Sequence, residues 1–367
     1  MRKWYLVPLV MLCLVLQSSL LACTDDGASG PTEAEETEQT VVTTTVRQTT
    51  TTLPLATWEL LAPEGESPEG RLGSSVYCDD EGGRLLLFGG WVERTTYTNV
   101  IWSYDLASGA WTDIRPETAL PAGRASHAWA HDPSGNSLIV FGGYDGTAYY
   151  GDTWAYDLRA GTWADLQPSG ATPRAREGHS LTYDPVSEKM ILFGGYDGGR
   201  EYDDTWSYDP ATNTWTELSP SGDIPAARDS HRVVYDPDEE IMVLFAGWST
   251  TTQFADTWAY DPADNAWTPL SPAGDVPVAR ALHAMAYDPT IKKVVLFGGG
   301  TSSAVFADTW TYDYPSNTWT ETRLTGGAPT GRAGHVLAFD EGAGRVILYG
   351  GSDGAGGFLD DTWGLNR

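Results

Sequence analysis

Short apolar segments separated by turn residues recur along most of this chain. In one stretch they occupy residues 180–183, 189–193, 204–208 and a segment that begins at Trp215. The second segment is apolar at four consecutive positions, 190–193, which is typical of a strand covered on both faces. Turn signals such as Asp184-Pro185 separate the segments. The pattern therefore predicts four short β-strands in this stretch.

The same four-strand pattern repeats with a nearly constant step. Its second strand ends in an aromatic residue followed by two glycines, and the step between copies is 53 and then 52 residues. The aromatic residue stands at Phe88, Phe141, Phe193, Phe245, Phe297 and Tyr349, with Phe245-Ala246-Gly247 as the variant. Six copies at this spacing indicate a repeat protein with one structural unit per copy.

Twelve of the sixteen tryptophans fall on two positions of the repeat. In the third strand these are Trp102, Trp154, Trp206, Trp258, Trp310 and Trp363. In the fourth strand they are Trp58, Trp111, Trp163, Trp215, Trp267 and Trp319. Large flat side chains at equivalent points of neighbouring sheets can fill the space between the sheets, so we expect both sets to be structural.

A period near fifty, a glycine pair after an apolar strand and two spaced tryptophans together resemble the kelch repeat. The chain resembles kelch β-propellers, such as the central domain of galactose oxidase, over about 310 of its 367 residues. The resemblance implies an all-β, six-bladed propeller with four antiparallel strands per blade, spanning residues 58–367. Residues 58–61 match a fourth strand, and the last repeat lacks one. We therefore expect the N-terminal strand to complete the last blade and close the ring, which hides the sheet edges.

The first 57 residues differ from the repeats. Residues 1–23 have the layout of a secretory signal, and Leu20-Leu21-Ala22-Cys23 resembles a bacterial lipobox, which predicts a lipid on Cys23. An uncleaved membrane anchor and a plain secretory signal are the alternatives. Residues 24–57 are rich in Thr and Glu, so we expect a disordered tether that reaches roughly 30 to 35 Å. The predicted location is extracytoplasmic, lipid-anchored to a bacterial cell membrane.

Composition fits that location and limits the partners. The formal charge of −28 repels nucleic acid and anionic lipid, so contact with a membrane should come only from the lipid anchor. Beyond the first 23 residues Cys78 is the one cysteine, and we expect a buried free thiol and no disulfide. We expect the propeller to be a monomer.

Functional residues are expected on the face that carries the loops between the fourth and first strands and between the second and third. The first set of loops ends in Pro-x-x-Arg, at Arg71, Arg124, Arg176, Arg228, Arg280 and Arg332. Five of these continue to a histidine, at His127, His179, His231, His283 and His335, with Ser74 in the first repeat. The second set carries the aromatic residues Trp91, Tyr97, Tyr144, Tyr149, Tyr150, Tyr196, Tyr202, Trp248, Phe254, Phe306 and Phe358. Sequence varies most in this second set, where a partner is expected to be recognised.

The arginines and histidines allow two interpretations. In the first, each arginine forms a buried ion pair with the aspartate that opens the third strand, assisted by a hydrogen bond from the histidine. These partners are Asp152, Asp204, Asp256, Asp308 and Asp361, with Asn99 in the first repeat. In the second, some of the arginines surround the mouth of the central channel and bind an anionic or polyhydroxylated ligand. A metal site made by the histidines is not expected, because equivalent side chains of six blades lie too far apart for one ion.

No pattern of catalytic residues stands out. The chain has no nucleophile elbow, phosphate loop or zinc helix, and the copper ligands of galactose oxidase cannot be matched, so we predict no catalytic residue and no cofactor. The leading hypothesis is a non-catalytic, surface-tethered module that binds a protein or a glycan through the aromatic loops. The alternative is a carbohydrate-active enzyme, similar to a sugar mutarotase, with its site at the channel mouth. That alternative requires one arginine freed from its partner, and Arg71 opposite Asn99 is the candidate.

Overall fold

The computed structural model describes residues 55–62, 65–117 and 119–367. The predicted signal, Cys23 and the tether up to residue 54 lie outside these residues. The first strand, β1 (Leu55–Leu61), begins three residues before the predicted start of the propeller. In the described residues no helix is long and apolar enough to cross a membrane.

The described chain is all-β and builds a series of sheets, one per repeat, numbered here in chain order. Sheet 1 contains β3 (Ser75–Asp79), β4 (Arg84–Phe88), β7 (Ile101–Asp105) and β8 (Trp111–Asp113). Sheet 2 contains β9 (Ala128–Asp132), β10 (Ser137–Phe141), β11 (Thr153–Asp157) and β12 (Thr162–Asp165). Sheet 3 contains β13 (Ser180–Asp184), β14 (Lys189–Phe193), β15 (Thr205–Asp209) and β16 (Thr214–Leu218).

The second half of the chain continues in the same way. Sheet 4 contains β18 (Arg232–Asp236), β19 (Ile241–Trp248), β20 (Gln253–Asp261) and β21 (Ala266–Leu270), with β17 (Ser221–Gly222) added at its edge. Sheet 5 contains β22 (Ala284–Asp288), β23 (Lys293–Phe297), β24 (Thr309–Asp313) and β25 (Thr318–Glu321). Sheet 6 contains β27 (Val336–Asp340), β28 (Arg345–Tyr349), β29 (Thr362–Asn366) and β1, with β26 (Arg323–Leu324) at its edge.

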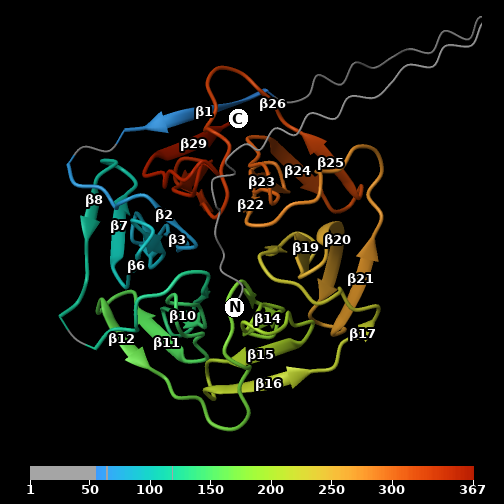
Figure 1. Ribbon diagram of the computed structural model, residues 1–367. Coiled ribbons are helices and arrows are strands. Elements are labelled where there is room, and N and C mark those ends of the chain that lie inside the picture. The colour runs from blue at the N-terminus through green and yellow to red at the C-terminus, as the bar shows by residue number, and fades with distance from the viewer. Residues whose placement is uncertain (1–54, 63–64, 118) are drawn as a thin grey trace, which may run out of the picture.

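Within each sheet the four main strands are antiparallel and follow chain order, except for β1. This strand pairs antiparallel with β29, from Thr57 opposite Asn366 to Leu61 opposite Thr362. Figure 1 shows the sheets arranged around a common centre, with the blue N-terminal strand beside the red C-terminal ones. The predicted all-β class and the four-stranded antiparallel sheets are confirmed.

A ring of backbone hydrogen bonds links the first strands of the sheets around the centre. Each sheet contributes the residue that lies two positions before its first strand, and its amide donates to the carbonyl of the equivalent residue in the preceding sheet. The members of this backbone ring are Gly73, Ser126, Gly178, Ser230, Leu282 and Gly334, and the amide of Gly73 donates to Gly334. The six N···O distances are 2.7 to 2.9 Å. All six residues have φ between 55° and 69°, the left-handed region that glycine adopts most easily.

The core lies between neighbouring sheets. The second strands are buried on both faces, as their apolar sequence predicted, and the fourth-strand tryptophans fill the space between sheets. Trp215 of sheet 3 packs on Phe141 of sheet 2 with ring centroids 4.9 Å apart, and its Nε1 donates to Thr153 Oγ1. Cys78 is a free thiol, but it is only partly buried, which corrects the predicted full burial.

Candidate functional site: the loop face

One end of the molecule gathers the two sets of loops that were expected to carry function. Short backbone pairings join them, including Ala125 with Tyr144 and Glu177 with Tyr196. In sheet 1 the pairing is longer and forms a small separate sheet of β2 (Arg71–Leu72), β5 (Trp91–Val92) and β6 (Thr96–Tyr97). We call this end the loop face. It comprises the loops 89–100, 142–152, 194–204, 246–256, 298–308 and 350–361 with the segments that precede the first strands.

Five of the six arginines are used in a repeated internal contact. Arg176 is fully buried and donates to both carboxylate oxygens of Asp204, while Trp206 Nε1 donates to the same carboxylate. We call this set an Arg–Asp–Trp unit. The others are Arg124–Asp152–Trp154, Arg228–Asp256–Trp258, Arg280–Asp308–Trp310 and Arg332–Asp361–Trp363. The ion-pair interpretation is therefore confirmed for five arginines.

In three of these units the pKa of the aspartate is lowered, which favours its charged state. Burial alone would raise the pKa of Asp256, but the hydrogen bonds and charge of Arg228 outweigh it and hold this pKa below its ordinary value. The same balance lowers the pKa of Asp152 and Asp361. Each arginine also donates to two backbone carbonyls; Arg176, for example, reaches Arg174 and Gly194. A buried guanidinium such as that of Arg176, with four of its five N–H donors used inside the protein, is a structural feature and not an open anion site.

Two of the tyrosines predicted to bind a ligand cover these arginines instead. The rings of Tyr150 and Tyr202 lie 4.3 and 4.1 Å from the guanidinium carbons of Arg124 and Arg176. Phe254 and Phe306 cover the next two arginines in the same way. Cation–π contact of this kind stabilises a buried charge. The side-chain direction, which sequence alone does not show, therefore gives these aromatic residues a structural task.

The histidines do not join the ion pairs, which corrects the predicted hydrogen bond. Each one turns its ring toward the aromatic residue of the preceding sheet, as His179 does toward Phe141 at 5.4 Å. The other pairs are Phe88–His127, Phe193–His231, Phe245–His283 and Phe297–His335. All five histidines are buried, and burial first of all lowers the pKa of each, so the imidazoles are neutral. They act as packing groups between sheets.

Six further aromatic residues of the loop face form a continuous series of ring contacts, which we call the aromatic arc. In order, its members are Phe358, Trp91, Tyr97, Tyr144, Tyr149 and Tyr196. Neighbouring ring centroids are 4.6 to 6.0 Å apart. The arc runs over sheets 6, 1, 2 and 3. Five of its rings are partly exposed, whereas Tyr196 is buried. Trp248, the remaining predicted residue, is partly exposed at the end of β19.

An acidic residue lies beside the arc. Glu177 belongs to the loop before β13, and burial followed by the charge of Asp229 raises its pKa to about 8. Burial and then the charge of Glu177 raise the pKa of Tyr97 to about 12, and they also raise those of Tyr144 and Tyr149. The phenols are therefore neutral hydrogen-bonding groups at physiological pH. Flat rings with polar edges suit a peptide or a sugar.

The first repeat departs from the others, and the predicted partner of its arginine was wrong. Val100, and not Asn99, occupies the aspartate position, because Gly89 N donates to Val100 O just as Gly194 N donates to Asp204 O. Asn99 donates to the backbone of Pro121 instead. The spacing to the tryptophan could have revealed this, since the aspartates stand two residues before it.

Arg71 itself is packed inside the sheet with 2% of its surface exposed. It donates to the carbonyls of Glu69 and Gly89, as the other arginines do to their equivalents. The enzyme hypothesis required an arginine turned to the channel mouth, and Arg71 does not provide it. Among the described residues, no group of three or more His, Cys, Asp and Glu side chains is arranged to hold a metal ion.

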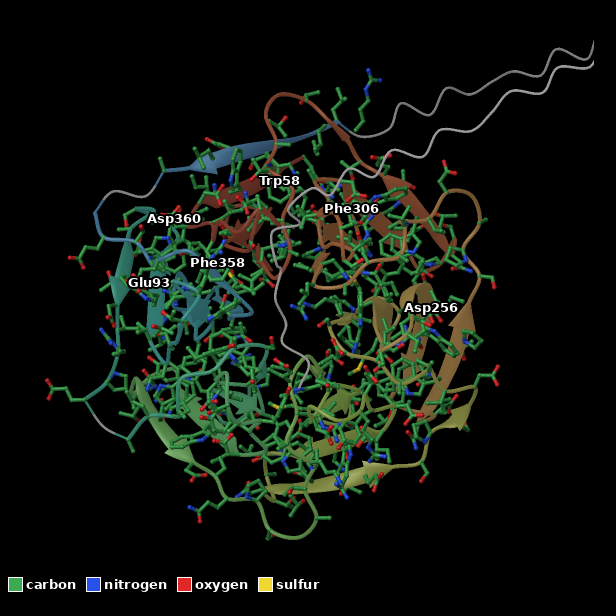
Figure 2. All side chains as sticks on the ribbon, viewed as in Figure 1. Trp58, Glu93, Asp256, Phe306, Phe358 and Asp360 are labelled. Carbon is green, nitrogen blue, oxygen red and sulfur yellow. The ribbon has the colours of Figure 1, made fainter. Side chains whose placement is uncertain are left out.

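A cavity of about 420 Å³ lies on the loop face where sheets 1 and 6 meet. Glu69, Glu93, Asp360 and Phe358 line it together with Arg94. Figure 2 shows Glu93, Phe358 and Asp360 grouped in this region. The cavity therefore lies beside the Phe358 end of the aromatic arc, and three acidic residues and one basic residue line it.

Comparison with known proteins agrees with this architecture. The family model described as the KLHDC2/KLHL20/DRC7 Kelch-repeats domain matches residues 34–247, 111–291 and 220–367. The chain belongs to this kelch-repeat family. Its repeats thus correspond to kelch units, and the tryptophans and glycine pairs described above recur from one repeat of this chain to the next.

Individual kelch relatives are distant in sequence. Host cell factor 2 of Homo sapiens is 29% identical over 212 residues, which are 52% of this chain and 26% of that protein. Acyl-CoA-binding domain-containing protein 5 of Arabidopsis thaliana is 28% identical over 240 residues, 62% of this chain and 36% of that protein. Kelch domain-containing protein 3 of Homo sapiens is 26% identical over 243 residues, 63% of this chain and 61% of that protein. The matches thus span less than two thirds of each relative.

Proposed function

We propose that this chain is a six-bladed kelch propeller, closed by β1, that serves as a non-catalytic binding module for a protein partner. The aromatic arc is the observation that carries the proposal. It places five partly exposed rings in contact with one another on the loop face, and aromatic residues of this kind are enriched in the cores of protein interfaces. The pairing of β1 with β29 and the backbone ring support the closed architecture.

The scaffold favours recognition through rigid groups. Both sets of loops are tied to each other by backbone pairs, and the buried Arg–Asp–Trp units hold them to the strands. Binding to pre-ordered rings costs less conformational entropy than binding to mobile ones. We favour a protein over a glycan because the arc crosses four sheets, which is wider than one sugar ring. A glycan is the second candidate, since the members of the aromatic arc are flat rings with polar edges.

The partner surface can be tested by replacing Tyr97 and Tyr144 with alanine, singly and together. We expect the double replacement to weaken binding at least about tenfold, because it removes two central rings of the arc. Affinity for a partner identified by envelope pull-down, or for a glycan retained on an array, would be measured by biolayer interferometry.

Tyr183→Ala is the matched control, because Tyr183 is a partly exposed tyrosine in the first strand of sheet 3, outside the loop face. It should leave the affinity unchanged. Circular dichroism would establish that all variants stay folded. A double variant that binds as tightly as the wild type would show that recognition occurs elsewhere.

We also propose that Cys23 carries a lipid and that residues 24–54 tether the propeller outside a bacterial cell membrane, on the basis of the sequence alone. Replacing Cys23 with serine should release the protein from the membrane fraction, because the acyl chains would be its only attachment. Cell fractionation and mass spectrometry of the N-terminal peptide would measure this. An unchanged membrane fraction would contradict lipid anchoring.

A further inference from the structure

The first repeat has lost the carboxylate of its Arg–Asp–Trp unit but has kept the groups that surround it. In the five complete units, one carboxylate accepts two hydrogen bonds from arginine and one from tryptophan, at 2.5 to 2.9 Å. Val100 stands in the place of that aspartate. Its side chain cannot accept a hydrogen bond, so the three donors of this repeat lose their common acceptor.

The donors remain in their usual positions. Arg71 keeps its two backbone contacts, to Glu69 O through Nε and to Gly89 O through Nη1, both at 3.0 Å. Trp102 Nε1 is buried and has no hydrogen-bond partner. Burial lowers the pKa of Arg71, whereas the nearby Tyr349, Glu69 and Asp113 act to raise it, and neither acid forms the two-pronged pair of the other units. A buried donor without an acceptor, such as Trp102 Nε1, is costly, which makes this an energetically favourable place for an added acceptor beside Arg71.

The same repeat has also opened space beside these donors. Thr98 occupies the position that Tyr150 and Tyr202 occupy in sheets 2 and 3, where each tyrosine covers its arginine. The three positions are equivalent because the amide of each residue donates to the carbonyl of the second glycine of its pair. Arg71, Thr98, Val100 and Trp102 all line a cavity of about 370 Å³. Four of the five complete units fill the equivalent space with an aspartate and an aromatic ring, and the Arg332 unit has an aspartate and Leu359 there, whereas a valine and a threonine leave the space open in the first repeat.

The charges around the cavity limit what can enter. Glu66 and Glu69 also line it, and Arg115 is engaged by Asp113 through bonds of 2.6 to 3.3 Å. The Tyr349 hydroxyl also contacts the Arg71 guanidinium from the side of sheet 6. A singly charged group can pair with Arg71, but a multiply charged anion would be repelled by the two glutamates.

We propose that this cavity binds a small organic monocarboxylate, whose oxygens accept hydrogen bonds from Arg71 and Trp102 in place of the missing aspartate side chain. The five complete units supply the template for this geometry. The ligand is either a free small acid or the side chain of an acidic residue of a partner. The site does not depend on the aromatic arc, so it can be present whatever the arc binds.

The test follows the Trp102 indole resonance by ¹H–¹⁵N NMR of the full chain during titration with sodium propionate, against sodium chloride at equal ionic strength and pH. The resonance is assigned with Trp102→Phe. We expect a saturable shift with a Kd on the order of millimolar, as suits so few ligand atoms. Propionamide, which has the same shape without the charge, should cause no saturable shift. Absence of a saturable shift with propionate, or an equal response to propionamide, would overturn the proposal.

Val100→Asp provides the decisive variant, because it restores the internal carboxylate of the other repeats. It should raise the melting temperature and abolish the propionate response. Ile101→Thr, one residue along, is the matched control: threonine occupies this position in the other third strands, so the variant should fold and still bind propionate. Equal binding by Val100→Asp would contradict the assignment.

Should Val100→Asp fail to fold, Trp102→Phe gives a second measurement. It removes one donor and keeps an aromatic ring, so ligand-induced thermal stabilisation by propionate should require at least about threefold more ligand. An unchanged dose response would contradict the role of the indole. N-acetylglutamate N-methylamide distinguishes the two sources of carboxylate. Binding of this compound supports an acidic partner side chain, and binding of propionate alone supports a free acid.

Discussion

At the scale of single residues, each departure from the repeat changes a contact with the neighbouring sheet. In the first repeat, Ser74 stands in place of the histidine. The last repeat has Tyr349 in place of the phenylalanine that would pack on this histidine, and the Tyr349 hydroxyl donates to Pro68 O at 2.7 Å. Where Ile101 replaces a threonine, Trp163 Nε1 is buried without a partner, whereas Trp215 and Trp267 donate to threonine hydroxyls. The first repeat and its two neighbours therefore carry most of the irregular positions.

Glu177 is the residue for which we predict a clear pH dependence. Its pKa rises to about 8 through burial and the charge of Asp229, so the folded protein holds this proton more tightly than the unfolded chain. The contribution to stability is then present below the ordinary glutamate pKa and is lost as pH rises toward 8. Glu177→Gln removes the titration. We expect the variant to be more stable than the wild type at about pH 8, with a smaller loss of unfolding free energy between about pH 5 and 8.

Urea denaturation across this pH range would measure the effect. Glu217→Gln serves as the control, because Glu217 is exposed and should leave the wild-type pH profile unchanged. A Glu177→Gln variant with the same pH profile as the wild type would mean that Glu177 is ionised normally in the folded protein.

At the scale of elements, the glycine pair explains how a second strand can end against the next sheet. A Cβ on Gly194 would lie 2.7 Å from Arg228 O and 2.9 Å from His231 Cε1, both in sheet 4. A Cβ on Gly195 would lie 2.9 Å from His179 Cβ in its own sheet. Both glycines also have positive φ, at 68° and 106°. The pair is thus required by contacts on two sides, and not only by the turn.

The strand β1 gives a quantitative test of closure. Trp58 is buried, packs on Phe297 at 5.2 Å and donates from Nε1 to Thr309 Oγ1, which reproduces the contacts of Trp215. If β1 completes the last blade, Trp58→Ala should lower the free energy of unfolding by about 3 to 5 kcal/mol, as expected for a buried tryptophan.

Trp215→Ala is the matched variant in the interior of the chain and should show a similar loss in chemical denaturation. A Trp58→Ala variant with wild-type stability beside a strongly destabilised Trp215→Ala variant would show that β1 contributes little, and closure by this strand would then be wrong.

At the scale of the whole molecule, the N-terminal and C-terminal parts of the described residues are joined by two independent sets of contacts. The sheet pairing of β1 with β29 connects them at the outside of sheet 6, and the hydrogen bond from Gly73 N to Gly334 O connects them at the backbone ring. Leu282 adopts a φ of 57° in this ring, an unfavourable value for a side chain other than glycine. The backbone hydrogen bonds of the ring therefore outweigh the conformational cost of the positive φ at Leu282.

Sequence alone determined the repeat, the strand order and the buried second strands, and it offered the pairing of arginines with aspartates as one of two interpretations. These features follow from spacing within one repeat, where neighbouring positions in the chain stay neighbours in the fold. The tertiary structure decided the rest: the histidines pack on the preceding sheet, and Tyr150 and Tyr202 cover arginines. The sheet-to-sheet contacts join residues of different repeats, and the direction of each side chain in a loop is set by backbone pairing that no local pattern reveals.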